Sequence, residues 1–439
     1  MFNKFSALVL LIIFGIGVLS GCSWSPKGIG KKYLMIKEIE QNEGNAQKRE
    51  IKFTRRSDGY PSEVEGLIKK YGEETRKGIE IEIVKIPGNA YDETLNMLFA
   101  SGEGPDVFEI SNQWIDSYIS NGWLADISRF IDAALLKKFP GWALGQAERY
   151  NSEARLYTLS SSLVTVRLIY NRELFKSAGL NPDLPPRTLE ELKEYAEKIR
   201  NTGKGYRSYG FAFPAGDAWN AFAQAMELTC LNSGIYYYDF NKGKYDLTVY
   251  EKWFEAITHM RRADSLFPGE TTLKTSVALT QFAKGNIGMM YISSKELSEL
   301  KNTLPKDMKY GIAMPPLYNE KASDKKLILS VSSYFGVNSQ SRYTEDAAEV
   351  WKLLYTEKYM AGLYKNGIEI PVFERVLHDP EGKQGFLSFS DFLPAEEERP
   401  FENTLKGVKD WTRFDAYLRA LKDAEGAAAR LRAESDRLN

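Results

Sequence analysis

Hydrophobic and polar residues alternate along this chain with two different periods, one typical of strands and one typical of helices. Residues 79–84 (Ile-Glu-Ile-Glu-Ile-Val) alternate at every position and predict a strand. Residues 91–100 place Leu95 and Phe99 on one face of a predicted helix, and residues 105–110 predict the next strand. Because strands and helices follow one another at this spacing, the pattern predicts an α/β fold with a largely parallel sheet.

The same rhythm continues towards the C-terminus. Residues 188–200 predict a helix that Thr188 caps, because Glu191 follows three positions later as in a capping box. The other regular segments predict strands at 51–54, 164–170, 287–292 and 327–337, and helices at 61–71, 219–226, 250–265, 275–284, 344–356 and 411–438.

The first 22 residues have the pattern of an export signal. One Lys in residues 1–4 precedes an apolar run over residues 5–19, which is shorter than the roughly 20 residues that span a bilayer. The run leads into Leu-Ser-Gly-Cys ending at Cys22, which resembles the lipobox of bacterial lipoproteins and implies a diacylglycerol on that Cys. The alternative is an ordinary secretory signal with an unrelated Cys. Residues 23–47 are rich in Lys, Glu and Gly, and we expect them to form a flexible tether.

Composition excludes several classes of function. A net charge of −1 argues against a nucleic-acid partner. Only two Cys are present, so an intramolecular disulfide is excluded once Cys22 is lipidated. With only two His, a multi-His metal site is excluded as well. Cys230 lies in an apolar stretch and is expected to be a small core residue, a catalytic thiol being the alternative. No nucleophile elbow or phosphate-binding loop is present, so we expect no enzyme, no cofactor and no metal.

Several segments resemble, in order, the solute-binding lipoproteins of bacterial ABC sugar importers, the extracellular solute-binding family 1. The resemblance covers about residues 50 to 370 and is weak beyond them. Its motifs are Gly-Ile-Glu-Ile-Glu-Ile-Val at 78–84, Ala-Ser-Gly-Glu-Gly-Pro-Asp-Val at 100–107, Asn-Gly-Trp-Leu-Ala-Asp-Ile at 121–127, Leu-Ile-Tyr-Asn-Arg-Glu-Leu-Phe at 168–175, Phe-Ala-Lys-Gly-Asn-Ile-Gly-Met-Met at 282–290 and Asp-Ala-Ala-Glu-Val-Trp-Lys-Leu-Leu at 346–354.

The resemblance implies a periplasmic-binding-protein-like fold of two discontinuous α/β lobes, joined by a hinge and closing on a ligand. We expect lobe one in residues 48–159 and 320–372, and lobe two in 160–319 and 373–439. The implied function is capture of a carbohydrate, an oligosaccharide, for the permease subunits of an ABC importer. The protein would work as a monomer, lipid-anchored on the extracytoplasmic face of the cell membrane.

Sugar sites combine aromatic rings with planar polar side chains, and 13% of this chain is aromatic. In open α/β sheets such sites lie at the carboxyl ends of strands. On the lobe-one side these ends contain Arg56 and Asp58, with helix capping as the alternative for Asp58, and Asn112 and Gln113. The neighbouring Trp114 would either contact the ligand or pack on the residue one helical turn later.

On the lobe-two side, the loop with Asp217 and Trp219 precedes a helix, and Trp219 is the best candidate for stacking on a sugar ring, core burial being the alternative. Ser293 and Lys295 follow a strand, where many relatives carry Gly-Ser-Trp-Glu-Leu. Lys295 stands in place of that Trp and leaves two alternatives open, a neutral ligand or an acidic saccharide that Lys295 pairs with. Tyr334 lies in a further loop expected on the ligand side.

Two other classes of function compete with sugar capture. One is binding of a different solute on the same fold, such as a polyamine, a peptide or a metal complex. The other is a lipid-anchored glycoside hydrolase, which would need two carboxylates flanking the scissile bond. The 59 Asp and Glu residues do not decide this point, because a chain with so many cannot lack carboxylates.

Overall fold

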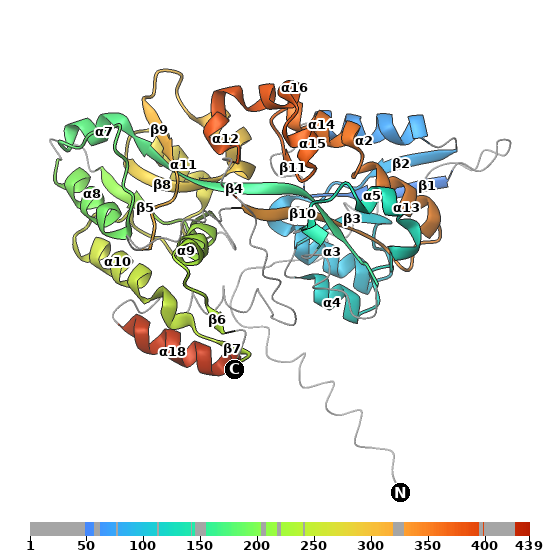
Figure 1. Ribbon diagram of the computed structural model, residues 1–439, viewed down its shortest axis with the longest axis horizontal. Coiled ribbons are helices and arrows are strands. Elements are labelled where there is room, and N and C mark those ends of the chain that lie inside the picture. The colour runs from blue at the N-terminus through green and yellow to red at the C-terminus, as the bar shows by residue number, and fades with distance from the viewer. Residues whose placement is uncertain are drawn as a thin grey trace, which may run out of the picture. The chain divides into compact units, whose positions relative to one another are not determined.

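The computed structural model contains a mixed nine-stranded sheet covered by helices (Figure 1). Residues 48–439 form one compact unit, to which everything below refers. Seven strands follow the order β2-β1-β3-β10-β4-β8-β5, and β9 and β11 each pair with β4. The structure describes residues 49–56, 62–75, 78–111, 114–141, 143–144, 155–202, 208–216, 221–239, 242–318, 329–394, 398 and 426–439.

The first half of the sheet is parallel. β1 (Arg49–Thr54) lies between β2 (Ile79–Ile83) and β3 (Val107–Ile110), with Phe53 opposite both Ile83 and Val107. Its helices and turns are α2 (Ser62–Thr75), η1 (Gly88–Ala90), α3 (Tyr91–Ala100), α4 (Ile115–Ser120), η3 (Ser128–Phe130), α5 (Ala133–Leu136) and α13 (Thr344–Leu353). The alternation at 79–84 and the apolar face of 91–100 are therefore confirmed as β2 and α3.

Two long strands join this half to the next. β4 (Leu159–Asn171) and β10 (Leu329–Val337) are antiparallel, with Leu329 opposite Thr165 and Phe335 opposite Leu159. β10 also pairs with β3, whereas the later part of β4, from Val166, pairs with β8 and β9. We call β4 and β10 the crossing strands; β4 runs through the middle of the sheet (Figure 1). The predicted largely parallel sheet is thus wrong in one respect: these strands and β9 and β11 are antiparallel.

The second half pairs β8 (Ile287–Ser293) in parallel with β5 (Tyr209–Ala212), and β9 (Tyr310–Ala313) with β4. The Thr188 hydroxyl accepts a hydrogen bond from the Glu191 N–H, which confirms the predicted cap. The remaining elements here are α7 (Arg172–Ser177), α8 (Leu189–Asn201), α9 (Ala221–Asn232), β6 (Tyr238–Asp239), β7 (Lys244–Tyr245), η4 (Leu247–Tyr250), α10 (Glu251–Arg262), α11 (Thr275–Ala283), η5 (Ser294–Glu296) and α12 (Leu297–Thr303).

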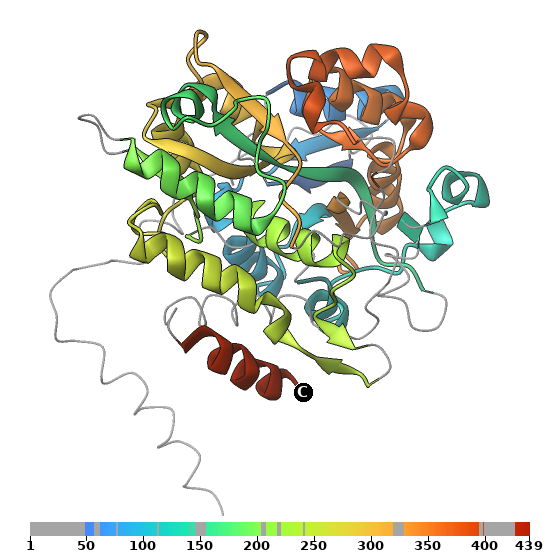
Figure 2. The ribbon, with the colours of Figure 1, turned by 60° about the vertical axis from the view of Figure 1, so that its left-hand side comes forward.

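The C-terminal segments divide between the two halves. α14 (Glu357–Lys365) packs on α2 and β11 (Ile370–Pro371), and then on α15 (Glu374–Leu377), α16 (Pro380–Lys383) and η6 (Gln384–Phe392). α18 (Ala427–Leu438), the described part of the helix predicted at 411–438, packs on α10 and η4 instead (Figure 2). Glu398 forms a fully buried ion pair of 2.9 Å with Arg167 of β4. The division into lobes stays a prediction.

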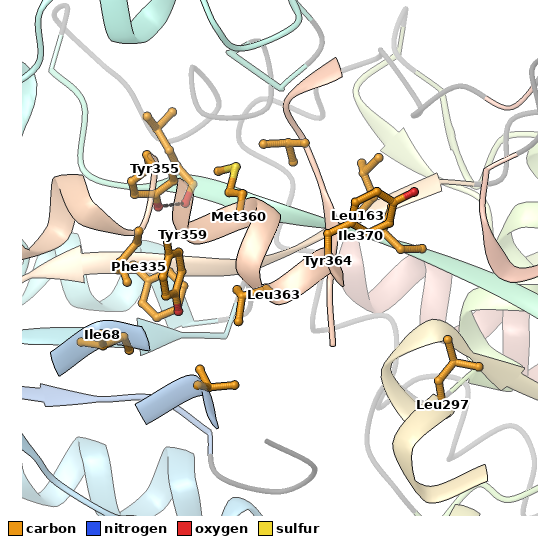
Figure 3. Close-up of a cluster of buried hydrophobic side chains, with 14 of the residues drawn as sticks. Ile68, Leu163, Leu297, Phe335, Tyr355, Tyr359, Met360, Leu363, Tyr364 and Ile370 are labelled. Atoms are coloured by element: carbon orange, nitrogen blue, oxygen red, sulfur yellow. Dashed lines mark hydrogen bonds between the residues drawn. The ribbon is translucent and has the colours of Figure 1, made fainter. Parts of the chain in front are cut away.

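The largest apolar core of the described residues includes the packing of α13 on β10, of α14 on β11 and of η6 on β4. Phe335, Tyr355, Tyr359 and Met360 form one part of it, and Leu297 belongs to the same cluster on the second half (Figure 3). The Tyr355 hydroxyl donates a 2.5 Å hydrogen bond to the Leu159 carbonyl. Because this core contacts both crossing strands, it fixes the backbone on which the candidate site stands.

Candidate ligand site at the crossing strands

The carboxyl ends of the parallel strands in both halves of the sheet face the crossing strands. β1 ends at Thr54 and β3 at Ile110, which lies opposite Tyr334 of β10. On the other side β8 ends at Ser293, which lies opposite Val166 of β4. Polar side chains that follow these strands are therefore directed to the same edge, where open α/β sheets hold their ligands.

Arg56 is held in place on the lobe-one side by four groups. Its guanidinium donates to the Asp92 carboxylate at 2.9 Å, to the Ser111 hydroxyl at 2.8 Å and to the Gly88 carbonyl at 2.9 Å. It also lies over the ring of Tyr91, 4.9 Å from its centroid. The side chain is still 34% exposed, so its outer face is open to a ligand while its inner face is engaged. The predicted sugar-facing role of Arg56 stays a prediction.

The preceding residue, Arg55, turns into the protein and was not predicted. Its guanidinium donates to the Glu369 carboxylate at 2.8 Å and to the Tyr359 hydroxyl at 2.9 Å, and its Nε lies 3.8 Å from Glu109. The Glu109 carboxylate in turn accepts from the backbone N–H of Arg56 at 3.1 Å. Burial and the nearby carboxylates raise the pKa of the Tyr359 hydroxyl above its ordinary range. This cluster fixes the direction in which the chain leaves β1.

Ser333 lies at the centre of the crossing strands in an unusual conformation. Its φ of 54° is in the left-handed region, which L residues rarely adopt. The ladder between β4 and β10 is interrupted at this one position, between the pairs Ser332–Ser162 and Tyr334–Ser160. Hydrogen bonds from side chains stand in place of the missing backbone pair. The Ser333 hydroxyl donates to the Glu369 carboxylate at 2.8 Å, and the Ser333 carbonyl accepts from the Ser161 hydroxyl at 3.2 Å.

Tyr334 is buried within the strand. It is 4% exposed and belongs to an apolar cluster with Phe108, Ile110 and Tyr118. Residues 329–337 form a continuous strand, so the strand predicted at 327–337 is confirmed and the expectation of a loop at Tyr334 is wrong. Its role towards a ligand stays untested.

Ser293 and Lys295 stand at the turn after β8. The Ser293 hydroxyl caps η5: it bonds the Glu296 carboxylate and accepts from the Lys295 N–H at 3.3 Å. The Ser293 backbone N–H donates to Glu296 at 2.7 Å. Burial raises the pKa of the Glu296 carboxyl, and the Ser293 bonds and the charge of Lys295 oppose only part of this effect. The Lys295 side chain is exposed. This geometry gives Ser293 a structural role and leaves Lys295 accessible.

Six predicted positions lie outside the described residues. Trp114, next to two of them, is half-buried and packs on the cluster that contains Tyr118, in line with the packing alternative. Its indole Nε1 is buried and has no hydrogen-bond partner in the described part of the chain. The six positions are Cys22, Asp58, Asn112, Gln113, Asp217 and Trp219.

Other chemistry finds little support in the described ranges. Cys230 is buried, and burial raises the pKa of its thiol well above the ordinary range, so it fits the predicted core role. Among these residues no group of three His, Cys, Asp or Glu side chains is arranged to hold a metal ion. None of the described helices combines the length and apolar character needed to cross a membrane.

Comparison with known proteins identifies the family. Residues 58–361 match the model of the bacterial extracellular solute-binding proteins. The chain belongs to this family. The predicted resemblance is thereby confirmed, and the family is one of binding proteins rather than enzymes.

Individual relatives agree with this assignment. The solute-binding protein is 24% identical over 362 residues to the galactooligosaccharide-binding protein of Bacillus subtilis, covering 79% of each chain. It is 30% identical over 161 residues to the maltotriose-binding protein of Pyrococcus abyssi, a match that spans 36% of this chain and only 31% of that relative.

A solved structure confirms the fold. The cyclic alpha-maltosyl-1,6-maltose binding protein of Arthrobacter globiformis superposes with a TM-score of 0.67 at 17% identity, covering 89% of the solute-binding protein and 98% of the other chain. The predicted α/β fold of the periplasmic-binding-protein type is therefore correct.

Weak sequence signals marked the residues that were missed. Glu109 is a charged residue inside a strand whose other members are apolar, and Glu369 occupies the same kind of position between Ile368 and Ile370. A buried carboxylate needs a partner, so these two positions could have indicated that a cation lies close by. The identity of that cation, Arg55, depends on the tertiary fold.

Proposed function

We propose that this solute-binding protein captures a carbohydrate, an oligosaccharide, outside the cytoplasmic membrane and delivers it to the permease subunits of an ABC importer. The observation that carries the proposal is the convergence of strand ends from both halves of the sheet on the two crossing strands. In this arrangement a ligand contacts both halves at once, and bending of β4 and β10 opens or closes the site. The sugars named for the relatives from Bacillus subtilis and Pyrococcus abyssi support a saccharide ligand.

Within this proposal Trp219 stacks on a sugar ring, and Asp58, Asn112, Gln113 and Asp217 bond hydroxyl groups together with Arg56. Ser293, Lys295 and Tyr334 complete the predicted set on the sides of β8 and β10. Binding needs no cofactor or metal and no bond is broken, so the protein is a receptor and not an enzyme. It acts as a monomer, because each chain contains both halves of its site.

A thermal-shift screen tests sugar capture. Full-length protein in mild detergent is heated with neutral and acidic mono- and oligosaccharides, a polyamine and a short peptide. A ligand present at 100 times its Kd adds about 2.7 kcal/mol to the free energy of unfolding, so a true ligand raises Tm by several degrees. A rise with a polyamine or peptide and with no saccharide contradicts the proposal.

The lipid anchor at Cys22 is a separate part of the proposal. A diacylglycerol supplies two acyl chains, which is the number that stable anchoring requires. Cys22→Ala should release the protein from membranes without lowering its Tm. A variant that stays with the membrane fraction after a high-salt wash would count against this anchor.

A further inference from the structure

The charged side chains at the candidate site are already committed to one another. On the lobe-one side Arg55 pairs with Glu369 and lies near Glu109, and Arg56 pairs with Asp92. Arg55, Glu109 and Glu369 are buried. The Arg56 guanidinium therefore reaches the site with the Asp92 carboxylate in hydrogen-bond contact, while Arg55 is paired in the protein interior behind it. Together the described lobe-one strand ends hold three carboxylates for two arginines.

At the lobe-two strand end a cation again lies beside a carboxylate. Lys295 is exposed after β8, and its charge acts on the Glu296 carboxylate, which is bonded to Ser293. The two sides together place three cations against four carboxylates. The described residues at these strand ends therefore carry no excess of positive charge.

We infer that the ligand is an uncharged saccharide, and that sugars carrying a carboxylate, sulfate or phosphate are rejected. This inference rests on the proposed function. An anionic sugar would have to take Arg56 from Asp92, or come to rest beside carboxylates that already outnumber the cations. Juxtaposed like charges oppose binding in a closed site, whereas the hydroxyl groups of a neutral sugar can donate hydrogen bonds to the same carboxylates. Of the two alternatives for Lys295, this favours pairing with its own neighbour over pairing with the ligand.

Calorimetric titration with matched sugars tests the inference. Full-length protein in detergent is titrated with galactotriose and trigalacturonate, and with xylotriose and its glucuronate-substituted counterpart. The neutral member of a pair is expected to bind at least tenfold more tightly. Equal or tighter binding of the acidic member overturns the inference and leaves sugar capture standing. Failure of every saccharide, neutral and acidic, overturns both.

Two further measurements test the cause. Asp92→Asn removes the carboxylate that pairs with Arg56. It should lower the ratio of the affinity for the neutral sugar to the affinity for its acidic counterpart at least threefold. The matched control is Asp183→Asn. It removes the carboxylate that lies 2.5 Å from the Arg172 guanidinium, beyond the far end of β4, and it should leave the affinity ratio unchanged. An unchanged ratio in Asp92→Asn contradicts the electrostatic explanation.

The second measurement uses the unaltered protein and does not depend on folding of a variant. Raising salt from about 0.01 M to about 1 M shortens the screening length from about 30 Å to about 3 Å. The ratio should shrink over this range, because like-charge repulsion weakens. A ratio that is independent of salt overturns the inference that charge determines the choice.

Discussion

Arg55 and Glu369 form a buried ion pair of 2.8 Å, although 314 residues separate them in the sequence. The pair joins the end of β1 to the turn that precedes β11, and the Glu369 carboxylate also accepts a hydrogen bond from the hydroxyl of Ser333 in the crossing strand β10. One carboxylate thus connects the loop that leads to Arg56 with the centre of the crossing strands. The Arg55 guanidinium and the Glu369 carboxylate each supply the opposite charge that offsets the cost of burying the other.

Removing one member of this pair should be costly. Glu369→Gln leaves the buried Arg55 guanidinium without its nearest carboxylate, and Arg55→Met leaves the buried Glu369 carboxylate without its cation. Each variant is expected to lower the free energy of unfolding by about 3–5 kcal/mol. The double variant should lose less than the sum of the two. Urea denaturation measures all three, with Glu173→Gln in the exposed Glu173–Lys176 pair as control, expected to change stability by less than about 1 kcal/mol. Additive losses would contradict direct coupling.

Two glycines give opposite predictions for the same substitution. A Cβ on Gly210 of β5 would overlap the backbone of Ala196 in α8, whereas a Cβ on Gly66 of α2 meets nothing within 4 Å. Gly210→Ala should therefore destabilise by about 1–3 kcal/mol or more, as overpacking does. Gly66→Ala should stabilise by about 0.5–1 kcal/mol, because it favours a helix interior. Thermal unfolding checks both, and equal effects would show that α8 does not pack this closely on β5.

Glu296 predicts a pH dependence. Burial raises the pKa of its carboxyl above the ordinary value of 4.5, so the folded protein holds this proton more tightly than the unfolded chain. Its contribution to stability is therefore present near pH 4.5 and lost as pH rises through the folded pKa. The unfolding free energy of the wild type minus that of Glu296→Gln should therefore decrease as the pH rises from 4.5 to 7.5. A difference that rises with pH would contradict the burial of this carboxyl.

Trp219 and Trp253 should respond differently to truncation. Trp253 is fully buried and its indole N–H donates to the Thr229 hydroxyl at 2.9 Å, so Trp253→Ala should lower stability by about 3–5 kcal/mol. If Trp219 stacks on a sugar, Trp219→Ala should instead weaken saccharide binding by about 2 kcal/mol or more and alter Tm little. A collapse of Tm with unchanged affinity of the folded fraction would assign Trp219 to the core.

Local signals predicted much of the fold. The helix after Thr188 follows from a capping box, and β2 follows from strict alternation, because both are decided by residues within a few positions. The site was harder, since its contacts are made across the whole chain. Arg55 and Arg56 are adjacent in sequence, yet one turns to Glu369 and the other to Asp92. The alternation at 327–337 predicted the strand that contains Tyr334, and the expectation of a loop at the serines before it conflicted with that strand, which pairs with both β3 and β4.

Reversible binding of a saccharide at the strand ends that face β4 and β10 can be measured by calorimetric titration of full-length protein with neutral oligosaccharides of two to five units. We expect saturable binding with one site per chain for at least one of these sugars. We also expect Arg56→Met, at the lobe-one strand end, to weaken that binding at least tenfold while the protein stays folded. Absence of binding to every one of these saccharides, or binding that Arg56→Met leaves unchanged, would show that no sugar is held at these strand ends.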